Sequence, residues 1–188
     1  MTDGKGAEPS GGLSTTGPLG WLWGPHSAMA GAVALTVAIV DQAHKWWMIA
    51  VYGIEQKQRV QVLPFFDLVY TLNTGISYSL LDGKSYSWQL ALAAFAAAAS
   101  TAMWIWIVRG GGSRLMALSL ALIIGGAIGN GIDRVTLGGV ADFFLLHAWG
   151  YNWYVFNIAD VAIVAGVLGL LYDAAVGSVS RNDAAKPS

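Results

Sequence analysis

The sequence contains no cysteine and few charged residues. Without cysteine, disulfides, thiol nucleophiles and thiolate metal sites are all excluded. Charged residues make up 11% of the 188-residue chain, whereas a soluble domain normally carries about 25%. The apolar fraction is 55%, which is more apolar surface than a chain of this length can hide from water. Lipid is the simplest explanation. The chain also lacks the basic surplus typical of nucleic-acid binding, so we expect no nucleic-acid partner.

Four stretches are long and apolar enough to cross a bilayer, which takes roughly 20 mostly apolar residues. They run over about 27–47, 87–108, 115–132 and 158–176. We therefore expect a mainly α integral membrane protein with four transmembrane helices in one domain over 27–178. Residues 1–26 are rich in Gly, Ser, Thr and Pro, so we expect a disordered tail there. A second, short tail is expected over 179–188.

The basic residues of the short connections predict the orientation of the chain. Those on one side of the membrane are Arg109, Arg114, Arg181 and Lys186. Under the positive-inside rule this side is cytoplasmic, which also places both termini in the cytoplasm. Lys57, Arg59 and Lys84 oppose this orientation. They lie in a longer segment that we expect to be folded, so they weigh less.

The segment between the first two helices has the composition of β-strands. Residues 59–73 are rich in β-branched and aromatic side chains. Alternate positions of its later half are apolar or aromatic, namely Phe66, Leu68, Tyr70 and Leu72. This period of two indicates strands, with Pro64 near a bend or an edge. We expect a small extracytoplasmic β-sheet over about 55–80, resting on the membrane.

The polar residues of the predicted helices gather at the outer side of the membrane. The ionisable ones are Asp41, Lys45, Asp133, Arg134, Asp142 and Asp160, and the amides Asn73, Asn130 and Asn157 join them. Ionisable residues at membrane depth are functional hypotheses by default. The three histidines match no metal-ligand spacing, so we expect neither a metal nor a cofactor.

Structural roles can also explain several of these residues. Asp41 and Lys45 have the i, i+4 spacing of a helical ion pair, and Asp133 can anchor the end of the third helix. Asn157 resembles a helix N-cap, with Asp160 as the acidic third residue of that helix. The glycines of 125–129 indicate close helix packing.

Asp142 and Asp160 are harder to explain as structural. Asp142 lies in the apolar run Gly-Gly-Val-Ala-Asp-Phe-Phe, with no basic neighbour. Two carboxyls that converge at a partly desolvated site cannot both ionise easily, so they share a proton. The charged member can take a proton from water while the protonated member donates to a carbonyl oxygen. This is the chemistry of aspartic proteases.

Five sequence blocks together carry a family resemblance. In chain order they are Asp41-Gln-x-x-Lys45, Asn73-Thr-Gly75, Gly125-Gly-Ala-x-Gly-Asn-x-x-Asp-Arg134, Val140-x-Asp-Phe143 and Phe156-Asn-x-Ala-Asp160. Their order and spacing resemble those of the lipoprotein signal peptidase (signal peptidase II) family over roughly residues 28–176. One departure is Gly131, which stands where the family usually has a bulky apolar residue.

The resemblance implies an aspartyl peptidase that removes the signal peptide from diacylglyceryl-modified prolipoproteins, cutting before the lipidated lipobox cysteine. It also implies a bacterial cytoplasmic (inner) membrane location, with the active site at the extracytoplasmic face. Membrane lipid is the other implied partner, and globomycin-type cyclic peptides are the implied inhibitors. The sheet would be the family's cradle, and the loop around 149–153 its mobile flap.

By position, the resemblance assigns the catalytic pair to Asp142 and Asp160. The implied supporting or substrate-binding residues are Asp41, Lys45, Asn73, Gly75, Asn130, Asp133, Arg134 and Asn157.

Three other classes of protein compete with a peptidase of this kind. A small proton-coupled transporter would favour carboxylates near the bilayer middle, but apart from Asp173 the acids cluster at one face. A non-catalytic assembly subunit would not require Asp142 in an apolar setting. A serine–lysine peptidase is disfavoured because Lys45, the only lysine within a predicted span, pairs better with Asp41.

Overall fold

The computed structural model describes residues 23–75, 85–110 and 112–184. Most of the tail expected over 1–26 lies outside the described residues. The same holds for the last part of the expected sheet segment, beyond Gly75, and for the end of the second tail, beyond Ala184.

Four long helices form most of the structure. They are α1 (Ser27–Trp46), α2 (Tyr86–Val108), α3 (Arg114–Thr136) and α4 (Ile158–Ala184). A π-helical turn (Trp47–Val51) and a short 3₁₀ helix (Ile54–Gln56) follow α1. The predicted mainly helical fold is confirmed, although α3 and α4 continue past their predicted ends at 132 and 176. Within the described part of the chain, α2, α3 and residues 158–176 of α4 are long and apolar enough to span a membrane.

Helix α3 is the centre of the helical part, because it packs against each of the other three helices. Two of its glycines allow this close approach. A Cβ at Gly125 would lie 2.6 Å from the Ala34 carbonyl oxygen of α1, and one at Gly126 would lie 2.5 Å from the Ala159 carbonyl oxygen of α4. The predicted close packing at the glycines of 125–129 is therefore confirmed.

The sheet has four antiparallel strands in the order β1-β2-β3-β4. The strands are β1 (Val60–Leu63), β2 (Phe66–Asn73), β3 (Val140–Ala148) and β4 (Tyr151–Phe156). The prediction of a sheet between the first two helices was therefore incomplete, since half of it comes from the segment between α3 and α4. The start of β3 is an almost continuous buried apolar run, because it pairs on both sides. It therefore lacks the alternation that marks a half-exposed strand.

The predicted features of the first hairpin are mostly present. A turn at Pro64 and Phe65 separates β1 from β2. Phe66, Leu68 and Tyr70 are half-buried, but burial does not alternate as predicted, because Asp67 is buried and Val69 is also half-buried. Leu72 is instead exposed, because the register against β3 shifts between Leu68 and Thr71 and interrupts the alternation.

The second hairpin ends in a tight turn at Trp149 and Gly150. Both residues have positive φ, 50° and 83° respectively. This conformation suits a two-residue hairpin turn. The side chain of Trp149 is 96% exposed, and Tyr151 and Trp153 are also largely exposed. The segment predicted as a loop around 149–153 is therefore a hairpin tip that presents aromatic side chains.

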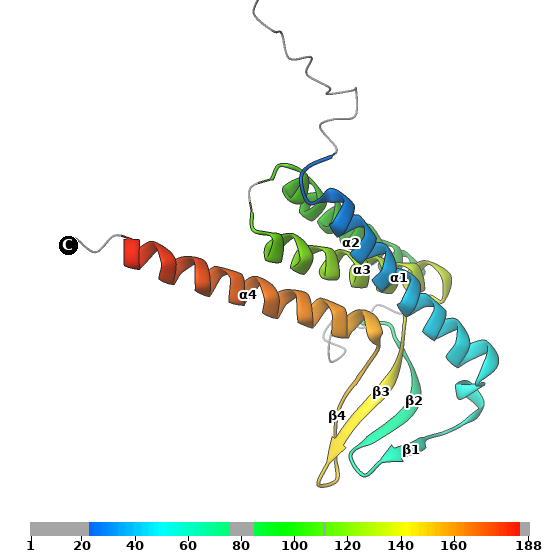
Figure 1. Cartoon of the computed structure of the whole chain (residues 1–188). Coiled ribbons are helices and arrows are strands. Elements are labelled where there is room, and N and C mark those ends of the chain that lie inside the picture. The colour runs from blue at the N-terminus through cyan, green and yellow to red at the C-terminus, as the bar shows by residue number, and fades with distance from the viewer. Residues whose placement is uncertain (1–22, 76–84, 111, 185–188) are drawn as a thin grey trace, which may run out of the picture.

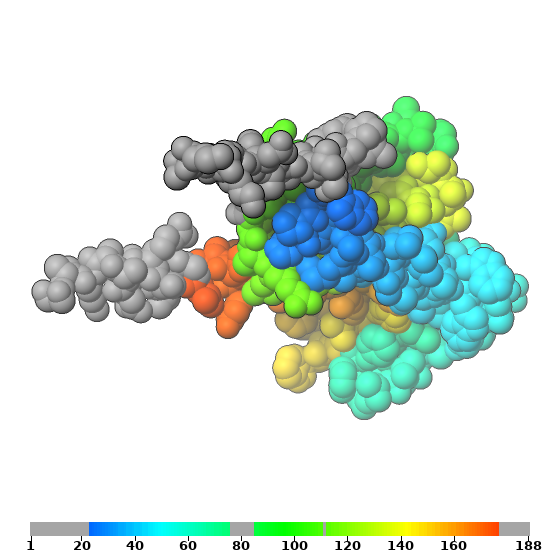
Figure 2. Space-filling model, turned by 45° about the horizontal axis from the view of Figure 1, so that its top comes forward, coloured from blue at the N-terminus to red at the C-terminus, as the bar shows by residue number. Residues whose placement is uncertain are grey.

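The sheet stands to one side of the helices, at the end where α1 and α3 finish and α4 begins (Figure 1). In the space-filling view the hairpins protrude beside the helical body, with β1–β2 in teal and the β3–β4 tip in yellow (Figure 2). The described links, from α1 to β1, from α3 to β3 and from β4 to α4, thus lie at one end of the helices, which is also where the predicted polar residues meet.

Candidate active site

The two aspartates proposed as catalytic lie in different elements, a strand and a helix, and both are bound by one asparagine. Asp142 is the third residue of β3, the strand paired with both β2 and β4, and its side chain is buried. Asp160 lies in the first turn of α4 and is half-buried. Asn157, which separates β4 from α4, binds both of them.

Asn157 uses different atoms for the two aspartates. Its Nδ2 donates to Asp142 Oδ1 at 2.7 Å, and its Oδ1 accepts from the backbone N of Asp160 at 2.9 Å. The backbone N of Asn157 donates in return to Asp160 Oδ2 at 3.3 Å. This reciprocal pair is a helix capping box, so the predicted N-cap is confirmed. Asn157 thus fixes the start of α4 and the Asp142 carboxyl through its side chain, and the Asp160 carboxyl through its backbone N.

The electrostatic setting of Asp142 favours its protonated form. Burial raises the pKa of Asp142, and the nearby charge of Asp160 raises it further, to about 7. Hydrogen bonds from Asn73 and Asn157 and the charge of Lys45 act in the opposite direction but do not offset these effects. Asp142 therefore keeps a proton up to near-neutral pH. This is the property expected of one member of a carboxyl pair that shares a proton.

Asn130 of α3 connects the carboxyl pair to the interior of the helices. Its Nδ2 donates to Asp160 Oδ1 at 2.9 Å. Its Oδ1 accepts from Asn157 Nδ2 and from Lys45 Nζ, each at 3.0 Å. Because both ends of the amide are used, the side chain has one orientation, and so has the Asp160 carboxyl that it holds.

Lys45 is a buried cation between two buried carboxylates. Its Nζ lies 2.8 Å from Asp41 Oδ2 and 2.6 Å from Asp133 Oδ2. All three side chains are at most 3% exposed. The predicted helical ion pair of Asp41 and Lys45 is therefore confirmed, but it is part of a larger cluster that joins α1 to α3.

The two carboxylates of this cluster each hold the backbone just before a proposed catalytic aspartate. Asp41 Oδ1 accepts from the backbone N of Ala159, which precedes Asp160, at 2.9 Å. Asp133 Oδ2 accepts from the backbone N of Ala141, which precedes Asp142, at 3.1 Å. Asp133 was expected to anchor the end of α3, and in fact it anchors β3 to α3. The Lys45 cluster thus sets the relative position of the two elements that carry the pair.

Gln42 is a member of this cluster to which the sequence reasoning gave no role. Its Nε2 donates to Asp133 Oδ1 at 2.8 Å and to the Gly129 carbonyl oxygen at 3.0 Å. It therefore fixes the Asp133 carboxyl from the side opposite Lys45. The available signal was its place in the first sequence block, as an amide between Asp41 and Lys45 in a largely apolar helix.

Asn73 and Gly75 lie on the other side of Asp142, at the end of β2. Asn73 Nδ2 donates to Asp142 Oδ2 at 3.2 Å, and Asn73 Oδ1 accepts from the backbone N of Gly75 at 3.2 Å. The second bond is a local turn that fixes the Asn73 amide. Each oxygen of Asp142 therefore has one amide donor, from Asn73 and from Asn157.

Arg134 is less closely tied to the pair than the other predicted residues. Its Nη1 donates to the carbonyl oxygen of Asn130, on its own helix, at 3.1 Å. The side chain is half-buried, and its charge interacts with those of Asp160, Asp133 and Asp142. Arg134 thus contributes positive charge to the surroundings of the carboxyls.

In the described part of the chain, two cavities open beside the aspartates. One, of about 280 Å³, is lined by Asp142 and by sheet residues that include Asn73 and Asn152. The other, of about 550 Å³, is lined by Asp160, by apolar residues of α4 and by the sheet. Trp153 and Tyr154 of β4 line both cavities. A substrate can therefore approach the pair from a side of mixed polarity and from an almost wholly apolar side.

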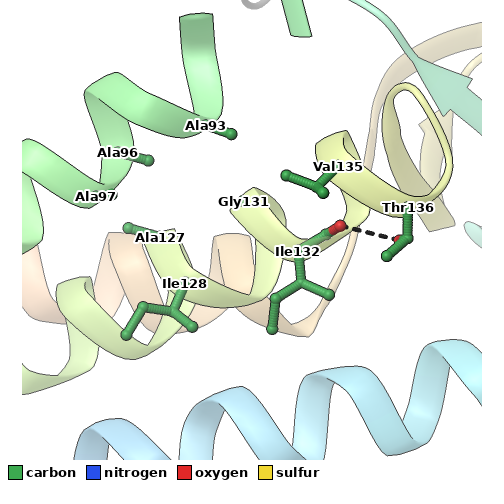
Figure 3. A pocket seen from close by; sticks show the side chains of 9 residues that line it. All are labelled: Ala93, Ala96, Ala97, Ala127, Ile128, Gly131, Ile132, Val135 and Thr136. Atoms are coloured by element: carbon green, nitrogen blue, oxygen red, sulfur yellow. Dashed lines mark hydrogen bonds between the residues drawn. The ribbon is translucent and has the colours of Figure 1, made fainter. Parts of the chain in front are cut away.

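A third cavity, of about 430 Å³, lies between α2 and α3 and has no ionisable residue in its lining (Figure 3). Its walls are small or aliphatic side chains, among them Ala93, Ala96 and Gly131. Among the described lining residues the one hydroxyl is that of Thr136, which donates to the Ile132 carbonyl oxygen at 2.9 Å. This cavity offers no group for acid–base chemistry, so the candidate active site is at the aspartates.

The chain is similar to known proteins over most of its length. The family model described as signal peptidase (SPase) II matches residues 33–176. A lipoprotein signal peptidase of Rhodopseudomonas palustris is 52% identical over 153 residues, which cover 79% of this chain and 91% of that protein. One from Methylocella silvestris is 50% identical over 159 residues, covering 81% of this chain and 92% of that protein.

Solved structures share the fold. A bacterial membrane enzyme determined by the in meso method superposes with a TM-score of 0.65 at 24% identity, covering 86% of this chain and 93% of that one. A second such enzyme gives a TM-score of 0.62 at 27% identity, covering 77% and 91%. Sequence, fold and site lead to one conclusion: the chain belongs to the signal peptidase II family of aspartic peptidases.

Proposed function

We propose that this protein removes signal peptides from diacylglyceryl-modified prolipoproteins, with Asp142 and Asp160 as the catalytic pair. The relatives that it matches over most of their length are named lipoprotein signal peptidases, which supports this substrate class. The observation that carries the assignment of the pair is the bridge through Asn157. Asn157 donates from its side chain to the Asp142 carboxyl, whose pKa is raised to about 7. Its backbone N donates to the Asp160 carboxyl, in the first turn of α4.

In the proposed mechanism a water molecule sits between the two carboxyls. Its oxygen attacks the carbonyl carbon before the lipidated cysteine, and the ionised Asp160 takes its proton. Asp142, which keeps a proton near neutral pH, donates it to the carbonyl oxygen. The tetrahedral intermediate then collapses, its hydroxyl proton returns to Asp142, and the proton on Asp160 passes to the leaving amine. Each carboxyl ends in the state in which it began.

The surrounding polar residues have positioning roles in this proposal. Asn73, Asn130 and Asn157 orient the carboxyls. The Lys45 cluster holds the backbone of the two elements that carry the pair. Because these groups are fixed before substrate arrives, little reorganisation accompanies the reaction. The two adjoining cavities would also receive inhibitors that mimic the substrate, such as globomycin-type cyclic peptides.

Two precursors that differ only in lipidation of the cysteine would test the substrate class. The acyl chains hold the cysteine at a fixed depth in lipid, so their binding energy can position the scissile bond against the pair. We expect the free-cysteine precursor to be cleaved more slowly by about a hundredfold or more. Both are incubated in the same detergent, and loss of intact precursor is followed by mass. Equal rates would mean that lipid does not position the bond and would favour a peptidase without lipid recognition.

The proposal includes a fourth membrane span, formed by α1. This helix has 20 residues, so its length is about 30 Å, which matches the hydrocarbon thickness. The charges that lower its hydropathy, Asp41 and Lys45, are buried within the protein. Its exposed side chains include Leu35, Ile39 and Val40, which suit lipid. The polar residues of α1 therefore do not oppose membrane insertion.

The proposed location is the bacterial inner membrane, with the sheet and the aspartates at the extracytoplasmic side. The domain over 27–178 would then have both tails, 1–26 and 179–188, in the cytoplasm. The orientation rests on the arginines that flank the turn between α2 and α3, Arg109 and Arg114. The exposed Trp46 and Trp47 place the end of α1, next to the sheet, at a membrane–water interface, because tryptophan gathers at both interfaces of a bilayer.

Single cysteines test this orientation cleanly, because the native chain has none. We expect a membrane-impermeant maleimide, added to intact cells, to label Ser85→Cys and not Ser10→Cys or Ser188→Cys. All three variants should be labelled after the cells are lysed, which controls for reactivity. Labelling of Ser188→Cys from outside would overturn the orientation. Three proposed spans separate residues 85 and 188, so protection of both Ser85→Cys and Ser188→Cys in intact cells would overturn the number of spans.

A further inference from the structure

The two cavities beside the aspartates differ in what surrounds them. The lining of the smaller cavity comes from the sheet and its edge, namely residues 71–75, Asp142, Leu145 and residues 152–155. Among the described residues, none from a long helix contributes to this lining. The larger cavity is lined on one side by Val161, Val164 and Leu168, which lie on the membrane-spanning part of α4. One cavity therefore lies on the sheet, and the other lies along a span.

The chemistry of the linings differs in the same way. The sheet cavity mixes the polar side chains of Thr71, Asn73 and Asn152 with apolar ones such as Leu72 and Leu145. Among its described lining residues the ionisable groups are Asp142 and the Tyr154 hydroxyl. The α4 cavity contains apolar and aromatic side chains, apart from Asp160. Because polar groups are costly to bury without partners, a polar chain segment is stabilised in the first cavity and a hydrocarbon segment in the second.

We infer that the sheet cavity binds the first residues of the mature chain beyond the lipidated cysteine, and that Asn152 determines specificity there. This inference rests on the proposed function. The scissile bond must lie between Asp142 and Asp160, so the substrate leaves the pair through the cavities that adjoin them. The mature chain is the part of the substrate that continues outside the membrane. Only the sheet cavity leads in that direction without running along a membrane-spanning helix.

The position of Asn152 suits it to contact the substrate residue that follows the lipidated cysteine. It belongs to β4, is exposed, and lines the sheet cavity without lining the α4 cavity. The described lining carries no basic group. A charge placed at position 152 would therefore act on a substrate side chain in this cavity with little competition from an opposite charge.

The test uses two lipidated precursors that differ only in the residue after the cysteine, lysine in one and aspartate in the other. The measured quantity is the ratio of kcat/KM for the lysine precursor to that for the aspartate precursor. A ratio within one enzyme cancels any effect of the variant on the catalytic pair itself. We expect Asn152→Asp to raise the ratio about fivefold relative to wild type and Asn152→Lys to lower it by a similar factor, as exposed charge pairs do.

Gln61→Glu is the matched control, because it adds the same charge to an exposed residue of β1 outside both cavities. Its ratio should equal that of wild type. An unchanged ratio in both Asn152 variants, or an equal change in Gln61→Glu, would overturn the inference while leaving the proposed function intact. If the wild-type protein cleaves neither precursor before the cysteine, the proposed function fails and the inference fails with it.

Discussion

Replacing either catalytic aspartate by asparagine is expected to reduce kcat/KM at least about a thousandfold, since the amide can neither accept nor donate the proton that the reaction moves. Asp142→Asn removes the group proposed to protonate the carbonyl oxygen, and Asp160→Asn removes the group proposed to deprotonate water. The two losses should not add in the double variant, because the pair acts as a unit. Turnover is measured with the lipidated precursor, and wild-type contamination is excluded by mass analysis of the enzyme.

The matched control for this prediction is Asp173→Asn, in the same helix as Asp160. The Asp173 carboxyl lies toward the other end of α4, where Oδ1 accepts from Ser113 Oγ at 2.5 Å. The chemical change is identical, but no proton transfer is assigned to this position. Its activity should stay within a few-fold of wild type. Turnover within tenfold of wild type in either Asp142→Asn or Asp160→Asn, with folded protein present, would refute the catalytic assignment.

Lys45→Met is expected to give the largest loss of stability, lowering the free energy of unfolding by about 3–5 kcal/mol. Methionine is similar in length but has no charge. The substitution would leave Asp41 and Asp133 as buried carboxylates without their cation. An uncompensated buried charge is costly, because the surrounding dielectric is low and water does not reach it. Unfolding by denaturant in detergent micelles measures the difference.

Two further variants separate charge burial from a general effect of losing a lysine. Lys57→Met removes an exposed lysine that lies 3.4 Å above the Tyr52 ring, and it should cost about 1 kcal/mol or less. Adding Asp41→Asn to Lys45→Met removes one of the stranded charges, so the double variant should be more stable than the sum of the single changes. Equal losses in Lys45→Met and Lys57→Met would show that the cluster does not stabilise the fold.

Hydropathy was sufficient to predict the helices, because a membrane span is a property of the local sequence. The bounds of α1 and α2 agree with the prediction to within one residue. The end of α3 was placed too early, at 132, because Asp133 and Arg134 were expected to lie beyond the apolar span. In the structure Asp133 is buried among α1, α3 and β3 and has its own partners, so the helix continues through it.

The sequence pattern that predicted the helices did not predict strands β3 and β4. Residues 140–145 are buried except for a half-buried Phe144, because β3 pairs with a strand on each side. Such a run has no period of two, and its partner β2 lies about 70 residues earlier in the chain. Long-range pairing of this kind is not encoded in local composition, so the sequence indicated the apolar setting of Asp142 but not the strand.

The sequence predicted which residues form the candidate site but not which groups they hydrogen-bond. The prediction of an outer polar layer required only that charges avoid lipid. Which backbone groups Asp41 and Asp133 bind depends on how α4 and β3 pack against α3. In the structure each of these carboxylates accepts from the backbone N just before one catalytic aspartate, an arrangement that the sequence alone could not predict. Gln42 was left without a role for the same reason.

The masses of the two products formed from a lipidated precursor test the central claim most directly. Purified wild-type protein and the Asp142→Asn variant are incubated in parallel with the same intact precursor. The account predicts that wild type gives one mature product beginning at the diacylglyceryl-modified cysteine and one complementary signal peptide, and that the variant leaves the precursor intact. Cleavage at another bond, or the same two products from Asp142→Asn at a comparable rate, would contradict it.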